Sequence, residues 1–336
     1  GFKVTDGDGD TVRSNLLLHV QDDAPVIDSS NNATVQLNED TVVTATNSHG
    51  STLSTEVGND SAANATGTLD FSFGADGEGN IALTGISTDD LNVYGLTATP
   101  NNDGTSMSVY QDQGDTALTL VATVTVDATT GAYSVTQNAP MIHPTLDGVA
   151  GDDAENNLDF TVNYSVTDGD GDTADGTLTV NVDDDMPTVR NYETNTMRII
   201  ADEGMADGLN GNGTNYQGNI NGKVSFDTGA DGGTVAWDLD NISIVNDKDS
   251  TPTVNGITFT VNEQGSLVIL QDQVEVATIS LNENTGAYSY LQTGNIIHQA
   301  GNDENNAVFE LGFKVTDGDG DTVRSNLLLH VQDDAP

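Results

Sequence analysis

Residues 160–187 read FTVNYSVTDGDGDTADGTLTVNVDDDMP, and this stretch decides the fold. On each side of its acidic loop, apolar residues alternate with polar ones: Phe160, Val162, Tyr164 and Val166 before the loop, and Leu178, Val180 and Val182 after it. A period of two gives a β-strand one buried face and one solvent-facing side. The stretch therefore predicts a hairpin of two strands that the Asp-Gly loop connects.

The same stretch is repeated along the chain. Residues 1–25 recur without change as residues 312–336, and residues 160–187 are a diverged copy of both. Between the copies, four shorter motifs keep one order: GADG at 74–77 and 229–232, QDQ at 111–113 and 271–273, TGAYS at 130–134 and 285–289, and Ile-His at 142–143 and 297–298. Colinear repeats of this kind indicate tandem modules. We expect residues 1–25 to be the C-terminal strands of a preceding repeat, residues 26–187 to be a first module, and residues 188–336 to be a second.

The segments between these motifs favour short strands. Turn-forming dipeptides such as Asn-Gly, Asp-Gly and Thr-Gly separate the strand candidates, and we find no convincing amphipathic helix. Short strands and frequent turns, in modules of roughly 150 residues, are typical of antiparallel sandwiches. The predicted fold class is all-β, with tandem antiparallel β-sandwich modules of an Ig-like or cadherin-like kind in a linear array.

Composition limits the partners. The chain has 53 acidic residues, 8 Lys and Arg, and a formal net charge of −45. Because a compact state with this charge repels itself, we expect multivalent cations to neutralise it. Nucleic acid is excluded as a partner, since its binding needs clustered basic residues. There is no cysteine to form a disulfide. No apolar run reaches the roughly 18 residues of a membrane helix, so we expect no direct membrane insertion.

The repeated loop carries carboxylates at positions i, i+2 and i+4, with glycines between them that permit a tight turn. Three converging carboxylates supply the hard oxygen ligands that suit Ca²⁺, whereas Zn²⁺ prefers His or Cys at a suitable spacing, which we do not find. A solubilising turn is the alternative, and three copies with unchanged acid spacing disfavour it. The predicted calcium ligands in the loops are Asp6, Asp8, Asp10, Asp168, Asp170, Asp172, Asp317, Asp319 and Asp321.

A second acidic cluster lies at each module junction. The predicted ligands there are Asp22, Asp23, Asp183, Asp184, Asp185, Asp333 and Asp334 at the exits, and Glu39, Asp40, Asp202 and Glu203 at the openings. We expect one module's exit and the next module's entry to share a calcium ion, which would fix the angle between them. A plain solvated linker is the alternative. Because His143 and His298 occupy equivalent repeat positions, we interpret them as structural.

The combination of TDGDGDT, a strand, Asp-Asp-x-Pro and an opening like Asn-Glu-Asp-Thr resembles the tandem repeats of type I-secreted bacterial RTX adhesins, over nearly the whole chain. This resemblance implies β-sandwich extender or ligand-presenting modules, rigidified by Ca²⁺ and displayed outside the cell on the surface of biofilm-forming Gram-negative bacteria. It also implies that neighbouring repeats of the same chain are partners. Junctional calcium is similar to that of cadherins, although their linker pattern is not matched.

Two functions fit these observations. The first is a calcium-rigidified extender that projects a ligand-binding tip, which the similar module lengths and the unchanged duplicated segment favour. The second is an adhesin module that recognises a glycan or peptide through a Ca²⁺-supported loop. That role calls for exposed aromatic residues, and aromatics make up only 5% of the chain.

The sequence gives no sign of a catalytic site. No arrangement of nucleophile and base is indicated, and a single tryptophan disfavours an aromatic-lined cleft for glycoside hydrolysis. We expect no enzymatic activity.

Overall fold

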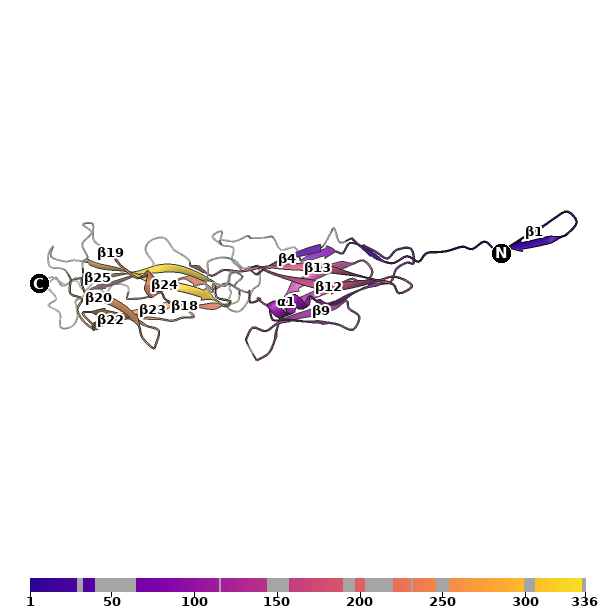
Figure 1. The fold of residues 1–336 in the computed structure, drawn as a ribbon. Coiled ribbons are helices and arrows are strands. Elements are labelled where there is room, and N and C mark those ends of the chain that lie inside the picture. Colours follow the sequence, from indigo (N-terminus) through magenta and orange to yellow (C-terminus); the bar gives the residue numbers. More distant parts are fainter. Residues whose placement is uncertain are drawn as a thin grey trace.

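The computed structural model describes residues 1–28, 33–39, 65–114, 116–143, 157–189, 197–202, 220–230, 232–245, 254–298 and 306–333. Two β-sandwiches lie end to end, and a small hairpin projects beyond the first, so the molecule is elongated (Figure 1). The predicted ligands Asp40, Glu203 and Asp334 lie outside the described residues, and only the backbone of Asp202 is described. Within these residues, no helix has the length and apolar character that a membrane span requires.

The first sandwich consists of two sheets around one core. One sheet has the order β4–β13–β12–β7, formed by Ala33–Asn38, Thr173–Asp183, Leu158–Thr167 and Asn80–Ile86. The other has the order β5–β11–β10–β9–β8, formed by Thr66–Thr68, Ala132–Gln137, Thr119–Val126, Ser106–Gln111 and Leu96–Pro100. A short pair, β3 (Val26–Ile27) with β6 (Phe71–Ser72), and one helix, α1 (Thr88–Val93), complete its described elements.

The second sandwich repeats this arrangement. One sheet has the order β15–β25–β24–β18, formed by Arg198–Asp202, Thr322–Gln332, Asn306–Asp317 and Gly233–Trp237, and β19 (Ser243–Val245) also pairs with β24. The other has the order β16–β23–β22–β21–β20, formed by Asn221–Lys223, Ala287–Gln292, Val274–Leu281, Leu267–Gln271 and Ile257–Val261. The short pair β14 (Thr188–Val189) with β17 (Phe226–Asp227) corresponds to β3 with β6, and a 3₁₀ turn, η3, covers Leu239–Asn241. The predicted all-β fold class is confirmed.

The hairpin β12–β13 forms the centre of the first sandwich, as the alternation of its residues predicts. Phe160 lies opposite Val180 in the ladder, and both side chains are fully buried between the sheets. Phe309 and Phe313 of β24 occupy the same kind of position in the second core. Burial of each such side chain contributes about 1.5–3 kcal/mol, so these hairpins supply much of the stability of each module.

One pairing in each sandwich departs from a purely antiparallel arrangement. Strand β4 runs parallel to β13, with Asn38 opposite Asp183, and β15 runs parallel to β25. Because parallel neighbours end at the same edge of a sheet, the opening strand of a module finishes beside that module's own exit. This pairing decides which acidic residues can meet.

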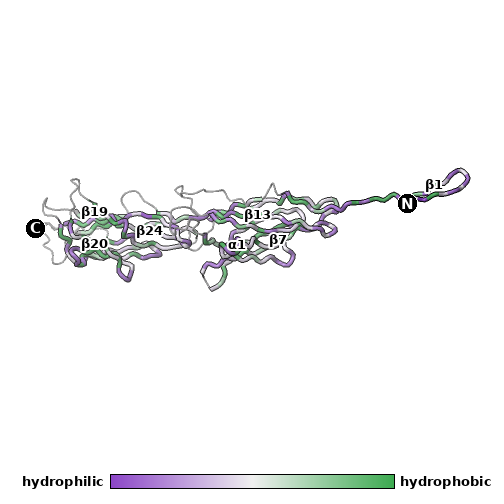
Figure 2. The backbone as a smooth tube through the Cα atoms, viewed as in Figure 1, coloured by the Kyte–Doolittle hydropathy of each residue, from purple (hydrophilic) through white to green (hydrophobic). Residues whose placement is uncertain are grey.

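Residues 1–25 form a separate hairpin, although their sequence is identical to residues 312–336. Strands β1 (Phe2–Thr5) and β2 (Thr11–Ser14) keep the register of β24 and β25, with Phe2 opposite Ser14, but their side chains are exposed. No other described strand pairs with them, and an isolated hairpin is marginal in water. The connection to the first sandwich begins with a hydrophobic stretch (Figure 2), and its residues Leu16–Leu18 are exposed.

Candidate metal centres

The Asp-Gly loop between β12 and β13 is closed by its first carboxylate. Asp168 Oδ1 accepts hydrogen bonds from the backbone N–H groups of Gly171 and Asp172, at 3.0 and 2.8 Å. Gly171 has a φ of +108°, which disfavours any other residue there. Asp168 Oδ2 is buried and has no hydrogen-bond partner among the described residues. One oxygen of this carboxylate therefore shapes the loop, and the other remains available to a ligand.

The three carboxylates of this loop crowd one another. Asp168, Asp170 and Asp172 each offer a ligand atom, and these atoms lie within 4.8 Å of one another. Burial raises the pKa of Asp168, but hydrogen bonds from Asp170 and from the loop backbone outweigh it and bring the pKa below its usual value. The same hydrogen bond with Asp168 is the largest cause that raises the pKa of Asp170, followed by burial and the charge of Asp22. Ionisation of one of these two carboxyl groups therefore disfavours ionisation of the other, and a divalent cation would relieve that repulsion.

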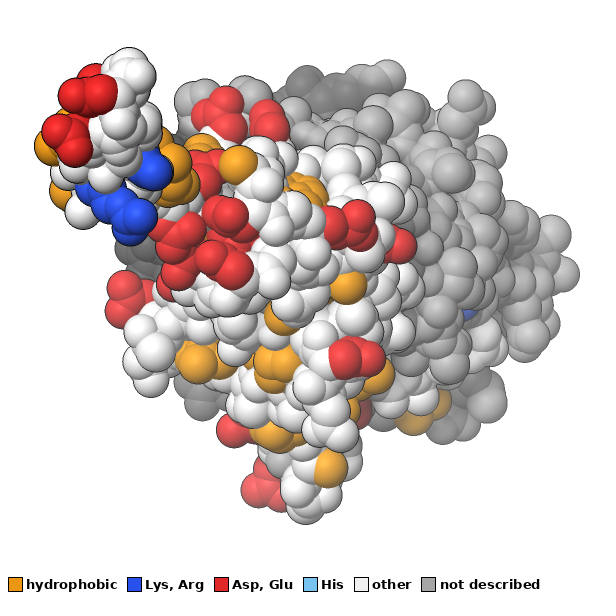
Figure 3. All heavy atoms as spheres, turned by 90° about the vertical axis from the view of Figure 1, so that its right-hand side faces the viewer, with side chains coloured by type: hydrophobic (Ala, Val, Ile, Leu, Met, Phe, Trp, Pro, Cys, Tyr) orange, Lys and Arg blue, Asp and Glu red, His pale blue; other side chains and the backbone are white. Residues whose placement is uncertain are grey.

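The linker before the first sandwich approaches this loop. Asp22 forms a group with Asp76 and Asp170 whose ligand atoms lie within 4.8 Å of one another. Figure 3, viewed from the N-terminal end, shows acidic side chains gathered on this end of the molecule. All three residues of the group are exposed, since only the small hairpin lies beyond them. They come from three separate segments of the chain.

The neighbouring linker residue has a structural task. Asp23 Oδ2 accepts a hydrogen bond from the backbone N–H of Ala75, at 2.7 Å, and so holds the GADG loop. A Cβ atom on Gly74, whose φ is +79°, would lie 2.7 Å from that same oxygen. Asp185 lies against Gly229 in the second sandwich with a corresponding separation of 2.8 Å. This contact explains why GADG recurs, and it separates the roles of two adjacent linker acids.

Acids from both sandwiches meet at the central junction. Asp184, in the linker after β13, groups with Asp319 and Asp321 of the loop between β24 and β25, again within 4.8 Å. The backbone N–H of His143 donates a hydrogen bond to Asp319 Oδ2 across the junction, at 3.2 Å. Asp319 Oδ1 is buried without a hydrogen-bond partner among the described residues. Six carboxylates of this region are buried: Glu39, Asp183, Asp184, Asp185, Asp317 and Asp321. Burial of this much negative charge is costly unless a cation compensates it.

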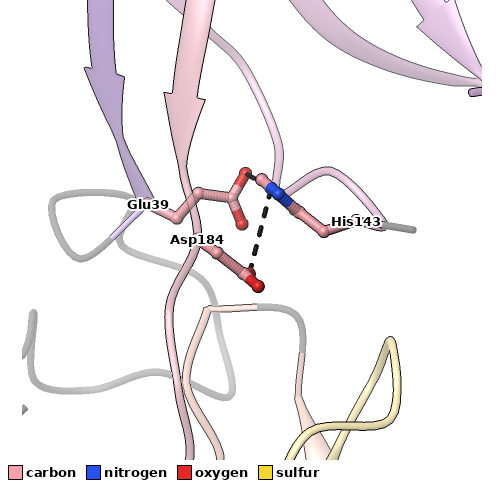
Figure 4. A group of neighbouring side chains, drawn as sticks. All are labelled: Glu39, His143 and Asp184. Atoms are coloured by element: carbon pink, nitrogen blue, oxygen red, sulfur yellow. Dashed lines mark ion pairs between the residues drawn. The ribbon is translucent and has the colours of Figure 1, made fainter. Parts of the chain in front are cut away.

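A second group shares Asp184 on the side of the first sandwich. His143 Nε2 lies 3.7 Å from Glu39 Oε1 and 3.9 Å from Asp184 Oδ1 (Figure 4). Glu39 Oε1 also accepts hydrogen bonds from the backbone N–H of Met141, at 2.8 Å, and from the side chain of Gln137. These donors fix the orientation of the Glu39 carboxylate.

The fold places these residues through two long-range contacts. The parallel pairing of β4 with β13 brings Glu39, just after Asn38, beside Asp184, just after Asp183. A buried glutamine holds the segment that carries the histidine: Gln111 accepts from the N–H of Ile142 and donates to its carbonyl, both at 2.8 Å. Gln271 binds Ile297, before His298, through the same two bonds. The first glutamine of each QDQ motif therefore positions an Ile-His pair.

The structure brings the predicted ligands together in combinations that differ from the predicted ones. Glu39 does not meet the preceding linker, because Asp22 and Glu39 lie at opposite ends of β13. The following module contributes its Asp-Gly loop to the central junction. Asp6, Asp8 and Asp10 form an exposed group that no other described residue joins. Asp333 acts electrostatically on His298, and burial lowers the pKa of that histidine. The grouping of His143 with two carboxylates was not predicted from the sequence. The repeated Ile-His pair was the one feature of the sequence that pointed to it.

Fold and sites together define a tandem β-sandwich protein with carboxylate clusters at the ends of its modules. Residues 26–183, which cover the first sandwich, match a family described as a domain of unknown function (DUF5801). A comparison with curated proteins found no match.

Solved structures with similarity to this chain include cadherin ectodomains. The protocadherin GammaB4 extracellular domain is 14% identical, with 94% of this chain and 35% of that chain covered and a TM-score of 0.27. For Drosophila N-cadherin EC1-4, the identity is 12%, the shares covered are 93% and 49%, and the TM-score is 0.26. For mouse cadherin-23 EC22-24, they are 14%, 93% and 67%, and 0.25. The chain spans about a third to a half of the length of the first chains it matches.

Proposed function

We propose that this chain is a calcium-rigidified extender region of a secreted bacterial surface adhesin. In this role it is an extracellular, non-enzymatic spacer that projects a ligand-binding tip from the cell surface for attachment and biofilm formation. Its partners are the neighbouring repeats of the same chain. The resemblance to tandem repeats of type I-secreted RTX adhesins and the end-to-end sandwiches support this function (Figure 1).

One observation carries the proposal. Asp184 belongs to the first module's exit, whereas Asp319 and Asp321 belong to the second module's loop, and their ligand atoms lie within 4.8 Å of one another. Without a cation, these carboxylates repel each other across the junction. A bound Ca²⁺ would convert that repulsion into coordination by both modules. Rigidity between the modules would then depend on calcium.

The chemistry of the donors fits Ca²⁺. The central group and the group at Asp168 consist of carboxylates, the ligand type that Ca²⁺ prefers at about 2.3–2.6 Å. The buried oxygens Asp168 Oδ2 and Asp319 Oδ1, which lack hydrogen-bond partners among the described residues, are suited to such an ion. Backbone carbonyls and water could complete a coordination number of about six to eight.

Calcium would act through linkage. Binding to the folded state stabilises it by RT ln(1 + [Ca²⁺]/Kd), which is about 2.7 kcal/mol per site at a hundredfold excess over Kd. Extracellular calcium modules commonly have a Kd of about 10⁻⁴–10⁻³ M. A chain with such sites would stay loose in a low-calcium cytosol and become rigid outside the cell.

X-ray scattering and thermal unfolding test this function, with calcium and then with excess chelator. Calcium should raise the melting temperature and narrow the range of shapes to an extended rod. The double variant D319N/D321N should lose the calcium-dependent rigidity. The matched control is D8N/D10N, the same two positions of the identical hairpin segment, which should keep it. Equal shape and stability of the wild type in chelator would refute the proposal.

The alternative function, recognition of a glycan or peptide beside a calcium ion, has less support. Of the aromatic residues that the structure describes, only Phe2 is exposed, and it lies on the small hairpin. Glycan-array binding that depends on calcium and survives removal of residues 1–25 would favour this alternative.

A further inference from the structure

The group of Glu39, His143 and Asp184 differs in kind from the all-carboxylate groups. Its side chains converge from three segments, after β4, after β11 and after β13 (Figure 4). Only 1%, 3% and 4% of their respective surfaces are exposed. The donor atoms are one imidazole nitrogen and two carboxylate oxygens, all within 4.8 Å of one another.

This donor set suits a borderline metal better than it suits calcium. Ca²⁺ takes oxygen ligands, whereas imidazole suits Zn²⁺ and its first-row neighbours. Tetrahedral zinc with ligands at about 2.0–2.1 Å holds its donors about 3.4 Å apart. The separations from His143 Nε2, 3.7 Å to Glu39 and 3.9 Å to Asp184, need to close by only a few tenths of an ångström. A water molecule could occupy the fourth position.

Charge balance supports the same reading. Two carboxylates and a neutral imidazole around a divalent cation sum to zero, which lowers the cost of burial at this depth. Asp184 also belongs to the group with Asp319 and Asp321, so its carboxylate could bridge two ions. The backbone N–H of His143 donates to Asp319, which ties the two groups together.

The surrounding residues already hold the donors in place. Metal-binding carboxylates are themselves commonly hydrogen-bonded, and Glu39 accepts from Met141 and Gln137. Gln111 fixes Ile142 and thereby the position of His143.

Part of the arrangement recurs at the end of the second sandwich. Gln271 fixes Ile297, the carboxylate of Asp333 acts on the half-buried His298, and Asp333 corresponds to Asp184 in the repeat. In both modules, therefore, a glutamine fixes the isoleucine that precedes a histidine near the module's exit.

We propose that Glu39, His143 and Asp184 form a binding site for a divalent cation of the zinc class. It is distinct from the all-carboxylate calcium group, with which it shares only Asp184. A junction between modules would then hold two ions of different chemistry.

The test is calorimetric titration of the chelator-stripped chain, residues 1–336, with Zn²⁺ in the presence of excess Ca²⁺. A parallel titration with Co²⁺ reports tetrahedral coordination through its visible absorption. The wild type should bind Zn²⁺ under these conditions. H143Q and, separately, E39Q should weaken the binding by roughly 10–100-fold or more. H19Q is the matched control, because His19 is exposed on the N-terminal segment, and it should bind as the wild type does. Thermal unfolding in calcium verifies that each variant is folded.

Two results would overturn the inference. One is Zn²⁺ binding that H143Q leaves unchanged. The other is Zn²⁺ binding that disappears as Ca²⁺ is added, since the metal would then occupy only the calcium group. Failure of the extender proposal has a different signature, because it concerns the effect of Ca²⁺ on shape and melting temperature. If Zn²⁺ binding depends on His143 in a chain that calcium does not stiffen, the extender proposal is refuted and the zinc-site proposal is supported.

Discussion

The backbone N–H of His143, in the first sandwich, donates a hydrogen bond to Asp319 Oδ2, in the second, at 3.2 Å. Asp319 thus contacts the first module directly while its other oxygen, which is buried, faces the acidic junction without a hydrogen-bond partner among the described residues. The Asp319 side chain therefore both joins the two modules through a hydrogen bond and adds negative charge to the junction.

Loss of this side chain should loosen the junction. In excess calcium, D319A should broaden the distribution of distances between the sandwiches. Because the chain has no cysteine, spin labels can be placed at the exposed positions Leu118 and Val274 after their change to Cys. Pulsed electron double resonance then measures the distribution of distances between the two labels. D8A, the same position in the hairpin segment, should leave it narrow, and equal widths for the two variants would contradict this role of Asp319.

Removal of the buried Gln111 side chain should destabilise the first sandwich. Gln111→Ala leaves the N–H and carbonyl of Ile142 without their partner, and an unsatisfied buried group costs about 1–3 kcal/mol. We expect the free energy of unfolding to fall by about 2–4 kcal/mol, measured by urea denaturation. Gln264→Ala, at an exposed turn position, should change it by less than about 0.5 kcal/mol. Similar losses for both variants would mean that the contact with Ile142 does not matter.

A turn in the first sandwich should respond to acid. The backbone N–H groups of Thr130 and Thr129 hold the pKa of Asp127 well below its usual value. A depressed pKa in the folded state means that this carboxylate stabilises above its unfolded pKa of about 3.9, and that the contribution is lost as pH falls below it. The second sandwich has Asn282 in the equivalent turn, which does not titrate.

The variant D127N isolates this effect. In chelator, the wild type should melt at a higher temperature than D127N at neutral pH, and the difference should vanish as the pH falls through the range below about 4. Scanning calorimetry at a series of pH values measures it. A difference that stays constant with pH would show that the charge of Asp127 is not responsible.

The duplicated segment provides a controlled comparison of burial. Phe313 is 0% exposed, whereas Phe2, the same residue of an identical sequence, is 54% exposed. Phe313→Ala should lower the free energy of unfolding by about 3–5 kcal/mol, because it leaves a cavity in the core. Phe2→Ala should change it by less than about 0.5 kcal/mol in urea denaturation. A large effect of the second variant would mean that the hairpin packs against another surface in solution.

Local pattern accounts for the fold class and for the strands at the centre of each sandwich. The alternation around Phe160 predicts a buried face, and the structure confirms it. The same pattern cannot decide between parallel and antiparallel neighbours, so the pairing of β4 with β13 was not predicted. Glu39 was therefore assigned to the wrong end of its module. Nor does local pattern determine burial, since identical residues are core at 312–333 and exposed at 1–22.

Some groups of the candidate sites could be predicted from local spacing, and others depend on contacts between distant segments. Carboxylates at alternate positions of a glycine-rich loop predict the groups within each loop, because their spacing is local. The separate roles of Asp22 and Asp23 depend on the GADG loop some fifty residues away, as the hydrogen bond from Ala75 shows. The association of His143 with Glu39 and Asp184 depends on strand pairing and on Gln111. The spacing of residues along the chain does not predict contacts between segments that are this far apart in the sequence.

The parallel pairing of β4 with β13, and of β15 with β25, gives each of the two sandwiches two unlike poles. The strand that opens a module and the strand that closes it finish together at one pole, with Glu39 and Asp184, while the Asp-Gly loop occupies the other. A complete junction needs one pole of each kind, so only modules stacked in the same direction can make it. An array of these modules is consequently a directional, head-to-tail filament. Each added module creates one further junction, and both extremities of the array keep half of one.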